Sequence, residues 1–287
     1  MAAARRAGYD VAMPELPEVE TVKRELEPWL TKRKIIRAER GPDAPAGPKY
    51  AGLERAAGQT IEAVTRLGKF IVMPLSGGDE LIVHLGMTGT LGAELPRDHL
   101  RVAVELAGRA PRTLYFRDPR RFGRFLVAPD GDRSALPTLA KIGPEPLEAS
   151  FTPAVFAAAT SRSGMGIKAL LLSQRAVAGV GNIYADEALW RAKIHPEAPA
   201  NQLSKARIAA LQQAIVEVLR ASVEARGTTL RDYRRVDGER GEFAAAIQAY
   251  GRDGEPCVRC GKTLARLVVG QRGTTYCPSC QRLPKGG

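Results

Sequence analysis

The spacing of the apolar residues changes once along this chain of 287 residues. Between Lys34 and Ala128, apolar and polar residues alternate in short segments, most clearly in Leu100–Leu106, and this period of two is typical of strands with one buried face. Beyond Pro153 the apolar residues recur every three or four positions, which is the period of an amphipathic helix. The chain therefore combines a strand-rich half with a helix-rich half and is predicted to have an α+β fold.

One helix precedes the strand-rich half, because apolar residues recur at helical spacing in Pro17–Leu30 and proline is tolerated in a first helical turn. Short strands separated by glycine and proline turns follow, and they predict a β-sandwich or barrel, of which we expect the sandwich. The predicted strands are Lys34–Glu39, Thr60–Arg66, Phe70–Leu75, Glu80–Leu85, Leu100–Leu106, Thr113–Phe116 and Arg124–Ala128.

Five prolines crowd the stretch from Pro129 to Pro153, where no periodicity survives, and we place a domain boundary there. The helices predicted beyond it are Pro153–Thr160, Ile167–Leu172, Asn182–Ala192 and Ser204–Arg226. The expected organisation is an N-terminal extension at 1–12, a sandwich domain at 13–129, a linker at 130–152, a helical domain at 153–249 and a cysteine-containing segment at 250–284.

The charge of the chain points to a polyanionic partner. Its 43 lysines and arginines outnumber 31 acidic residues, which gives a net charge of +12 and suggests either nucleic acid or an acidic membrane surface. No run approaches the roughly 18 apolar residues that span a bilayer, which excludes a transmembrane protein. Because residues 1–12 also lack an apolar stretch, we expect a cytoplasmic protein with reduced thiols.

The four cysteines form two pairs with the spacing of a zinc site. Cys257-x2-Cys260 and Cys277-x2-Cys280 are separated by 16 residues, so each pair can present two thiolates from one tight turn while the intervening residues form a hairpin. Two disulfides or idle thiols are the alternatives. Four thiolates leave no open coordination position, so we predict one structural Zn²⁺.

From Met13 the chain reads MPELPEVETVKREL, and this block and seven others resemble the formamidopyrimidine-DNA glycosylase family. The related endonuclease VIII branch shares the architecture but does not begin with ELPEVE. The resemblance implies a β-sandwich with a leading helix, a helix–two-turns–helix domain and a β-hairpin zinc finger. The other blocks are LGKF (67–70), HLGMTG (84–89), DPRRFG (118–123), GPEPL (143–147), GVGNIYADE (179–187), YGRDGEPC (250–257) and QRGTTYCPSC (271–280).

The resemblance implies a base-excision-repair DNA glycosylase with AP lyase activity, which removes 8-oxoguanine and formamidopyrimidines from damaged duplex DNA. Pro14 would be the nucleophile: an N-terminal amine has a pKa of roughly 8 and can attack the anomeric carbon to give a Schiff base. Glu15 would be the general acid-base. Lys69 would donate a proton for β-elimination and contact phosphate, and Arg272 would assist δ-elimination.

Residue type alone gives these four positions ordinary interpretations. Pro14 and Glu15 would form the turn that leads into the first helix. Lys69 would be a solvated strand lysine, and Arg272 a non-specific phosphate contact.

A base inside a duplex is out of reach, so the nucleotide must be flipped out and the space that it leaves must be filled. Met87, Arg120 and Phe122 resemble the residues that fill this space in the family, with Arg120 hydrogen-bonding the estranged cytosine. Met87 and Phe122 would otherwise be assigned to the core, although DPRRFG is a turn-like string.

Further DNA contacts are expected from the resemblance. Asn182 lies at a predicted helix start, where backbone N–H groups bind phosphate, although it could be a plain helix cap. The stretch Thr229–Phe243 resembles a mobile loop that closes over the flipped purine, with a disordered basic loop as the alternative. The other expected contacts are Arg97, Arg162, Lys168 and Tyr250.

The N-terminal extension at 1–12 departs from the family pattern, and we expect it to be missing from the mature enzyme, with initiation at Met13 followed by removal of the methionine. If the extension is retained, the Pro14 nitrogen is an amide and has no nucleophilicity. The alternative function is then a catalytically silent lesion- or DNA-binding homologue. A zinc-ribbon adaptor would explain the cysteines but not the N-terminal block. We expect a monomer without membrane contact, associated with the nucleoid.

Overall fold

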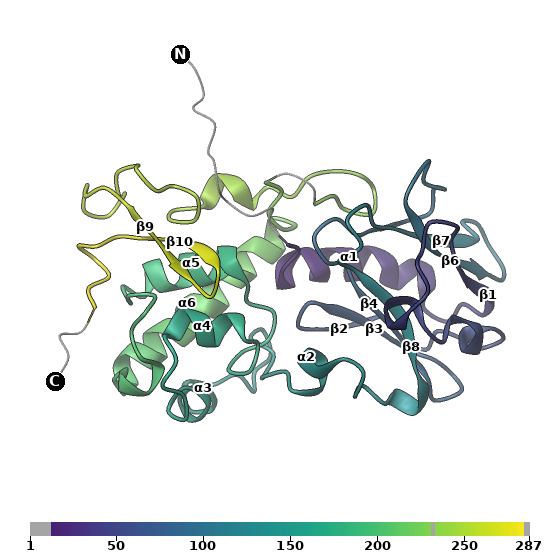
Figure 1. The fold of residues 1–287 in the computed structure, drawn as a ribbon, viewed down its shortest axis with the longest axis horizontal. Helices are drawn as coiled ribbons and strands as arrows, with labels where there is room; N and C mark the ends of the chain where they lie inside the picture. The colour runs from purple at the N-terminus through teal and green to yellow at the C-terminus, as the bar shows by residue number, and fades with distance from the viewer. Residues whose placement is uncertain (1–12, 231–232, 284–287) are drawn as a thin grey trace, which may run out of the picture. The chain divides into compact units, whose positions relative to one another are not determined.

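The computed structural model describes residues 13–230 and 233–283, and most of its helices and strands are labelled in Figure 1. These residues form two compact units. The sandwich unit comprises residues 13–141 and 223–242, and the helical unit comprises residues 142–222 and 243–283. The predicted extension at 1–12 lies outside the described residues. No helix in the described ranges is long and apolar enough to cross a bilayer.

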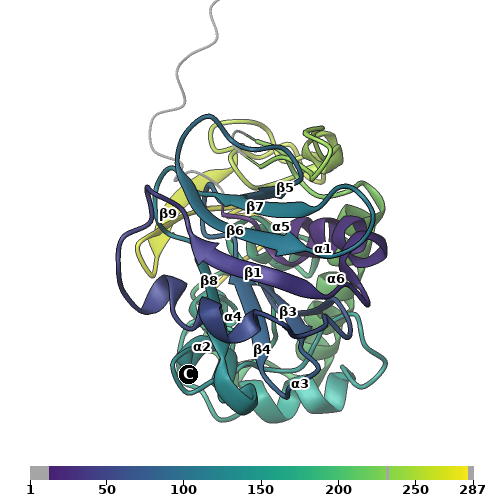
Figure 2. The ribbon, with the colours of Figure 1, turned by 90° about the vertical axis from the view of Figure 1, so that its right-hand side faces the viewer.

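The sandwich unit holds two four-stranded antiparallel sheets (Figure 2). One sheet has the order β1-β6-β7-β5 and the other the order β2-β3-β4-β8, so both mix strands that are distant in sequence. The strands are β1 (Ile35–Arg40), β2 (Thr65–Leu67), β3 (Phe70–Pro74), β4 (Glu80–His84), β5 (Thr90–Gly92), β6 (Leu100–Leu106), β7 (Thr113–Arg117) and β8 (Arg124–Ala128).

Aromatic and aliphatic side chains of both sheets make one core. Phe116 of β7 and Phe125 of β8 are fully buried with their ring centroids 5.7 Å apart, so they pack between the two sheets. The helix α1 (Leu16–Leu30) joins this core through Leu26 and Leu30, which are also fully buried. Burial of this apolar area is the main stabilising contribution to the unit.

The strand predictions were wrong at two places. In Thr60–Arg66 only isolated bridges at Thr60 and Ile61 and the start of the short strand β2 form, because residues 62–64 between them do not continue the ladder. The strand β5 was missed because its three residues, Thr90–Gly92, are too few to show an alternation.

The helical unit follows the predicted helices closely. They are α3 (Pro153–Thr160), α4 (Ile167–Leu172), α5 (Asn182–Arg191) and α6 (Lys205–Glu224), preceded in the chain by the single turn α2 (Pro137–Ala140) of the sandwich unit. Thr152 caps α3 by accepting a 3.3 Å hydrogen bond from the amide of Val155. The short 3₁₀ helices of the chain are Pro48–Tyr50, Leu53–Ala56, Pro129–Gly131, Ala200–Gln202 and Phe243–Ala246.

The predicted hairpin consists of β9 (Ala265–Val269) and β10 (Arg272–Tyr276), which pair antiparallel. Gly270 and Gln271 connect them, and both have positive φ angles of 54° and 63°. Two positive φ angles define a type I′ turn, whose twist matches that of the flanking strands. This turn fixes the register that places Arg272 opposite Val269.

The segment 223–242, which the sequence places in a helical domain at 153–249, belongs instead to the sandwich unit. Thr228 and Glu242 of this segment form an isolated bridge. Arg235 forms a 2.7 Å ion pair with Glu25 of α1, whose carboxylate also accepts a 2.7 Å hydrogen bond from the amide of Val236. The end of α6 is therefore followed by a closed loop anchored on α1.

Candidate functional site

The start of α1 holds the two residues expected to carry the chemistry. Pro14 and Glu15 are both buried, and Glu15 is the extended residue that caps α1. Its backbone N–H donates a 2.9 Å hydrogen bond to the side chain of Glu18, and its carbonyl accepts one of 3.1 Å from Val19. Because hydrogen bonds hold both the backbone N–H and the carbonyl of Glu15, they fix the backbone position from which its carboxyl side chain extends, next to Pro14.

Glu18 also binds the loop at 223–242. Its second carboxylate oxygen accepts a 2.6 Å hydrogen bond from the amide of Thr228, and its carbonyl accepts one of 3.3 Å from the hydroxyl of Tyr233. Burial, followed by the Glu18 charge, raises the pKa of Tyr233 well above its usual value, so the phenol stays protonated and remains a donor. Glu18 thus links the candidate acid Glu15 to the loop.

Lys69 lies in a two-residue turn, not in a strand as expected. The pair Leu67 and Phe70 closes the hairpin between β2 and β3, and Gly68 has the positive φ of 57° that the turn requires. His84 packs its ring 4.7 Å from that of Phe70. Burial, followed by the positive charges of Lys69 and Arg124, lowers the pKa of His84 to about 4.

A neutral His84 is consistent with its hydrogen bond, since Nδ1 accepts a 3.1 Å bond from the amide of Gly86. The charges that remain near it, on Lys69 and Arg124, are both positive. The positive charges of Lys69 and Arg124 therefore give the surroundings of His84 the sign of charge that attracts an anionic phosphate.

Two loops of the HLGMTG and DPRRFG blocks are tied together by Asp118. Its fully buried carboxylate accepts 2.7 Å hydrogen bonds from the hydroxyl of Thr88 and from the amide of Gly123. The Thr88 hydroxyl in turn accepts a 3.2 Å bond from the amide of Arg120. A side chain at Gly86 would lie 2.5 Å from the Gly123 nitrogen, so this close backbone approach needs glycine.

The buried guanidinium of Arg101 also binds the backbone of this turn. It donates a 2.8 Å hydrogen bond to the carbonyl of Asp118 and further bonds to the carbonyls of Asp43 and Pro119. Each donor of a planar guanidinium has a fixed direction, so Arg101 fixes the path of the chain into the turn. The turn is consequently rigid although its outer side chains are exposed.

Arg120 and Phe122 are exposed in this turn, as is Arg121 between them. Phe122 is 49% exposed, and the Arg120 guanidinium lies 5.1 Å from the centre of its ring. Met87 is half-buried on the adjoining loop. The interpretation of Phe122 as a core residue is therefore wrong, whereas the space-filling role of the three residues stays a prediction.

Arg97 and Arg162 are exposed, each within its own unit. Arg97 lies in the loop between β5 and β6 and lines a cavity of about 1000 Å³ together with Thr88, Arg117 and Pro119. Arg162 directly follows the end of α3. Both guanidinium groups are accessible to a phosphate.

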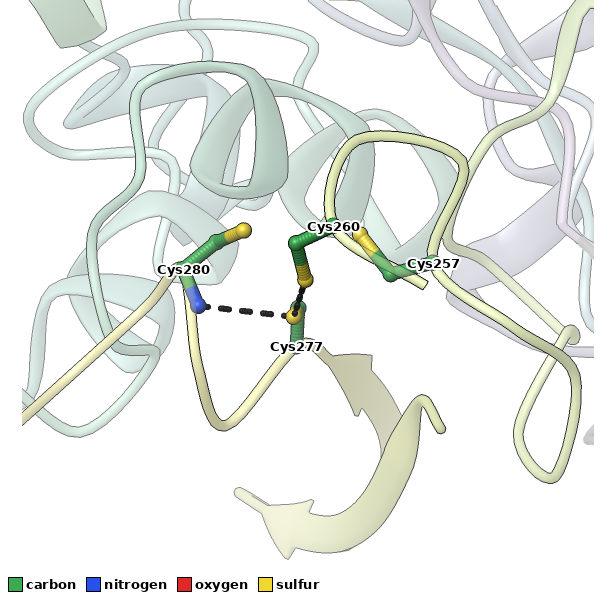
Figure 3. A group of neighbouring side chains, drawn as sticks. All are labelled: Cys257, Cys260, Cys277 and Cys280. Atoms are coloured by element: carbon green, nitrogen blue, oxygen red, sulfur yellow. Dashed lines mark hydrogen bonds between the residues drawn. The ribbon is translucent and has the colours of Figure 1, made fainter. Parts of the chain in front are cut away.

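The helical unit brings the four cysteines together. Their sulfur atoms all lie within 4.8 Å of one another, and Figure 3 shows them turned toward a common centre. The Sγ atoms of Cys260 and Cys277 are 3.5 Å apart, and all four thiols are free of disulfides. A zinc ion with four Zn–S bonds of about 2.3 Å fits such a cluster, so the geometry supports the zinc assignment over disulfides.

Lys168 requires a correction. Its ammonium group is fully buried, 2.5 Å from the carboxylate of Asp186, and donates a 2.7 Å hydrogen bond to the hydroxyl of Thr274. Asp186 also accepts a 2.9 Å bond from the amide of Thr275. With no exposed surface for a phosphate, Lys168 does not contact DNA directly. Instead, this network attaches β10 to α4 and α5.

Burial determines the direction of the pKa shifts of two acidic residues in α5. Burial raises the pKa of Asp186 to about 7 in spite of the opposing charge of Lys168. Burial also raises the pKa of Glu187, whose carboxylate accepts hydrogen bonds from the amides of Gln248, Ala249 and Tyr250 at 2.8 to 2.9 Å. The side chain of Tyr250 is only 5% exposed, which leaves little of it for a DNA contact.

Asn182 is the first residue of α5, as expected, but it does not cap that helix. Its side-chain amide donates a 3.0 Å hydrogen bond to the carbonyl of Gly273, next to Arg272 at the start of β10. The helix start and the hairpin that carries Arg272 are therefore joined. A phosphate contact by Asn182 stays a prediction.

Three family models match consecutive parts of the chain. Residues 13–125 match the formamidopyrimidine-DNA glycosylase N-terminal domain, residues 142–234 match the H2TH domain of the same glycosylase, and residues 254–283 match a zinc finger found in FPG and IleRS. A formamidopyrimidine-DNA glycosylase of Deinococcus radiodurans is 45% identical over 94% of this chain and 98% of its own. One from Thermus thermophilus is 46% identical over the same shares.

The chain belongs to the formamidopyrimidine-DNA glycosylase family. Among solved structures, the MutM (FPG) protein from Thermus thermophilus has a TM-score of 0.86 and 44% identity, covering 95% of this chain and all of that one. A Lactococcus lactis FPG mutant in complex with a Fapy-dG containing DNA has a TM-score of 0.81 and 36% identity, over 94% and 100%.

Membership in the formamidopyrimidine-DNA glycosylase family confirms the expected fold, with a sandwich and leading helix, an H2TH domain and a hairpin zinc finger. It also confirms one structural zinc ion on the four cysteines. The chain is a bifunctional DNA glycosylase and AP lyase.

The sequence interpretation missed the acidic residues that position the site in this glycosylase. Glu18 follows the capping residue Glu15 by three positions, which is the spacing of a capping box and could have revealed it. Asp118 precedes a proline in a turn, a common place for a side chain that binds nearby amides. Asp186 gives no local signal, since its partners lie far away in sequence.

Proposed function

We propose that this chain excises oxidised purines from duplex DNA through a Schiff base on Pro14 and then cleaves the strand by β- and δ-elimination. The observation that carries the proposal is the buried start of α1, where the carboxylate of Glu18 binds the backbone N–H of Glu15, the residue that follows Pro14. Related proteins support the substrate class, because they were crystallised with DNA containing Fapy-dG or carbocyclic 8-oxo-G.

In the first step the Pro14 nitrogen forms a bond to C1′ of the damaged nucleotide while the bond between C1′ and the base breaks. The electron pair of that bond leaves with the base, which takes up the proton that the Pro14 nitrogen loses, and Glu15 protonates the ring oxygen as the sugar opens. The product is an iminium ion, or protonated Schiff base, between Pro14 and the sugar.

The iminium ion acidifies the proton on C2′, so its removal expels the 3′ phosphate in β-elimination. A second elimination expels the 5′ phosphate. We assign the proton transfer at the first elimination to Lys69 and the assistance at the second to Arg272, each of which also balances phosphate charge.

Duplex recognition would use the exposed residues of both units. Met87, Arg120 and Phe122 would fill the space left by the flipped nucleotide, with Arg120 reading the opposite cytosine. Arg97, Arg162, Asn182 and the edge of Tyr250 would contact the backbone, and the loop at 229–243 would cover the base. We place the enzyme in the cytoplasm, associated with the nucleoid, and expect it to act as a monomer.

A catalytically silent DNA-binding form is the second candidate for a chain that retains the residues before Pro14, and one observation favours it. In the full chain the Pro14 nitrogen is bonded to Met13, so it is an amide without a lone pair free to attack. Such a form could bind a lesion but could not form the Schiff base.

The proposal is tested with a protein that begins at Pro14 and a labelled duplex containing one 8-oxoguanine opposite cytosine. We expect a single cut that leaves phosphates on both new ends, the product of β,δ-elimination, and no cut in the matched duplex with guanine. Release of the base without strand cleavage would contradict the lyase assignment, and equal cutting of both duplexes would contradict lesion recognition.

A further inference from the structure

Trp190 connects the helix α5 to the first cysteine pair. Its side chain is 7% exposed and packs among Ala249, Leu264 and the thiols of Cys257 and Cys277. The indole N–H donates a 3.4 Å hydrogen bond to the Sγ atom of Cys257. An indole is a donor only, so this contact has one direction and needs an electron-rich sulfur as acceptor.

Arg259 lies within the first cysteine pair and contacts the other side of the same residue. Its guanidinium lies 4.0 Å from the centre of the Trp190 ring and donates a 3.0 Å hydrogen bond to the Trp190 carbonyl. A guanidinium at this distance over an indole is attracted by the ring face. Through Arg259, the turn between Cys257 and Cys260 is therefore held on α5 by a cation–π contact and a hydrogen bond.

These contacts surround a site whose charge is not balanced by its metal. Four thiolates around Zn²⁺ carry a net charge of −2, which favours N–H donors to sulfur and a nearby cation. We propose that Trp190 and Arg259 retain the zinc ion by holding the first cysteine pair on α5. Both are positioning residues that act on zinc through its ligands: Trp190 acts through Cys257, and Arg259 acts through the turn that follows Cys257 and through Cys280, with which its side chain forms a hydrogen bond.

Apolar packing alone would explain the burial of Trp190, but it would not explain the orientation of its N–H or the stacked guanidinium. In Trp190→Phe an aromatic face for Arg259 remains, one ring of the indole is lost and the donor to sulfur is removed. Only the loss of the donor changes the electron density on the sulfur, and there the two explanations differ. The chain offers a matched control in its other tryptophan. Trp29 lies in the sandwich unit, where its N–H donates to the carbonyl of Pro111 at 3.1 Å.

The experiment measures zinc release from the purified full chain into an excess of the chromophoric chelator 4-(2-pyridylazo)resorcinol. Loss of outer contacts to metal ligands typically costs roughly 10–100-fold in metal affinity, so we expect Trp190→Phe to release zinc at least about tenfold faster. Trp29→Phe should release it at the wild-type rate. Equal rates for Trp190→Phe and the wild type would overturn the proposal.

A spectrum separates hydrogen bonding from packing. With Co²⁺ in place of zinc, loss of the N–H donor makes the Cys257 thiolate a better electron donor, and the thiolate-to-cobalt charge-transfer band should move to lower energy in Trp190→Phe. Trp29→Phe should leave the band in place. An unchanged band in Trp190→Phe would show that the indole acts by packing alone and would overturn the role of its N–H.

A second variant decides the matter if Trp190→Phe does not fold. Arg259 is exposed, so Arg259→Ala leaves the core intact, and we expect it to release zinc several-fold faster than the wild type. The control is Arg282→Ala, which removes one exposed cation beside the second cysteine pair, where Arg282 donates to the carbonyl of Ser279. Equal release by Arg259→Ala, Arg282→Ala and the wild type would overturn the proposal.

Discussion

The backbone amide of Glu15 donates a 2.9 Å hydrogen bond to the carboxylate of Glu18, so a second acidic residue holds the backbone of the candidate acid-base catalyst. The other oxygen of Glu18 accepts a hydrogen bond from the amide of Thr228, directly before the loop 229–243. One buried carboxylate therefore fixes both the N-terminal end of α1 and the loop that is expected to cover the damaged base.

Replacing Glu18 by alanine should damage both stability and base excision. It removes the carboxylate acceptor of two buried amides, and each such loss costs about 1–3 kcal/mol in the free energy of unfolding. Urea denaturation measures that loss, and single-turnover excision should slow at least about tenfold as Glu15 loses its anchor. Glu27→Ala, which removes an exposed carboxylate paired with Lys23, is the control and should change neither quantity appreciably. Normal excision by folded Glu18→Ala would show that Glu15 needs no such anchor.

Arg120→Ala should lose its preference for cytosine opposite the lesion. A good base contact is worth about 1–3 kcal/mol of discrimination, so the ratio of excision rates opposite cytosine and opposite adenine should fall by about 5- to 150-fold. Arg112→Ala removes an exposed cation that donates to the carbonyl of Gly108, away from the turn at 118–123, and should keep the wild-type ratio. An unchanged ratio in Arg120→Ala would make Arg120 only a phosphate contact.

The half-buried imidazole of His84 should make the fold sensitive to acid. Its pKa is about 4 in the folded chain and 6.5 ordinarily, so between these values the unfolded state binds a proton that the folded state does not. The free energy of unfolding should therefore fall as the pH drops from 6.5 to 4, by at most about 1.4 kcal/mol per pH unit from this group, and stay level above 6.5. His84→Gln should flatten this slope in urea titrations at pH 7, 5.5 and 4.5. If the free energy of unfolding of His84→Gln falls with pH as steeply as that of the wild type, the acid sensitivity arises from other groups.

Lys168→Met should destabilise the protein without reducing its number of phosphate contacts. The substitution leaves Asp186 buried without its cation, which typically costs about 3–5 kcal/mol. Lys168→Met with Asp186→Leu should recover much of the loss. In DNA-binding titrations the slope of log affinity against log salt should match the wild type, whereas Arg162→Ala should lower it by about one phosphate contact. A lowered slope in Lys168→Met would restore Lys168 as a DNA contact.

The elements with a long periodic pattern could be predicted from the sequence, because burial of one face dictates both the pattern and the structure. The helices α3 and α4 begin and end at the predicted residues, and the cysteine pairs converge as their spacing indicates. The strand β5 and the turn at Lys69 could not be predicted, since three residues carry no period and a glycine alone does not reveal its φ angle.

The contacts that position the site escaped prediction for a different reason. Thr228 binds Glu18 across 210 positions of sequence, and Thr275 binds Asp186 across 89. Local patterns carry no information about such pairs. Lys168 was misread because a lysine is rarely buried, and only the structure supplies the buried carboxylate that makes its burial possible.

Borohydride trapping tests the central claim, that Pro14 is the nucleophile, most directly. A protein that begins at Pro14 should be fixed covalently to 8-oxoguanine duplex by sodium borohydride, because reduction of the iminium ion makes the bond between Pro14 and C1′ permanent. A mass-verified protein that retains Met13 before Pro14 should give no adduct, although it should still bind the duplex. If the two proteins trap equally well, Pro14 is not the nucleophile, and a side-chain amine such as that of Lys69 takes its place.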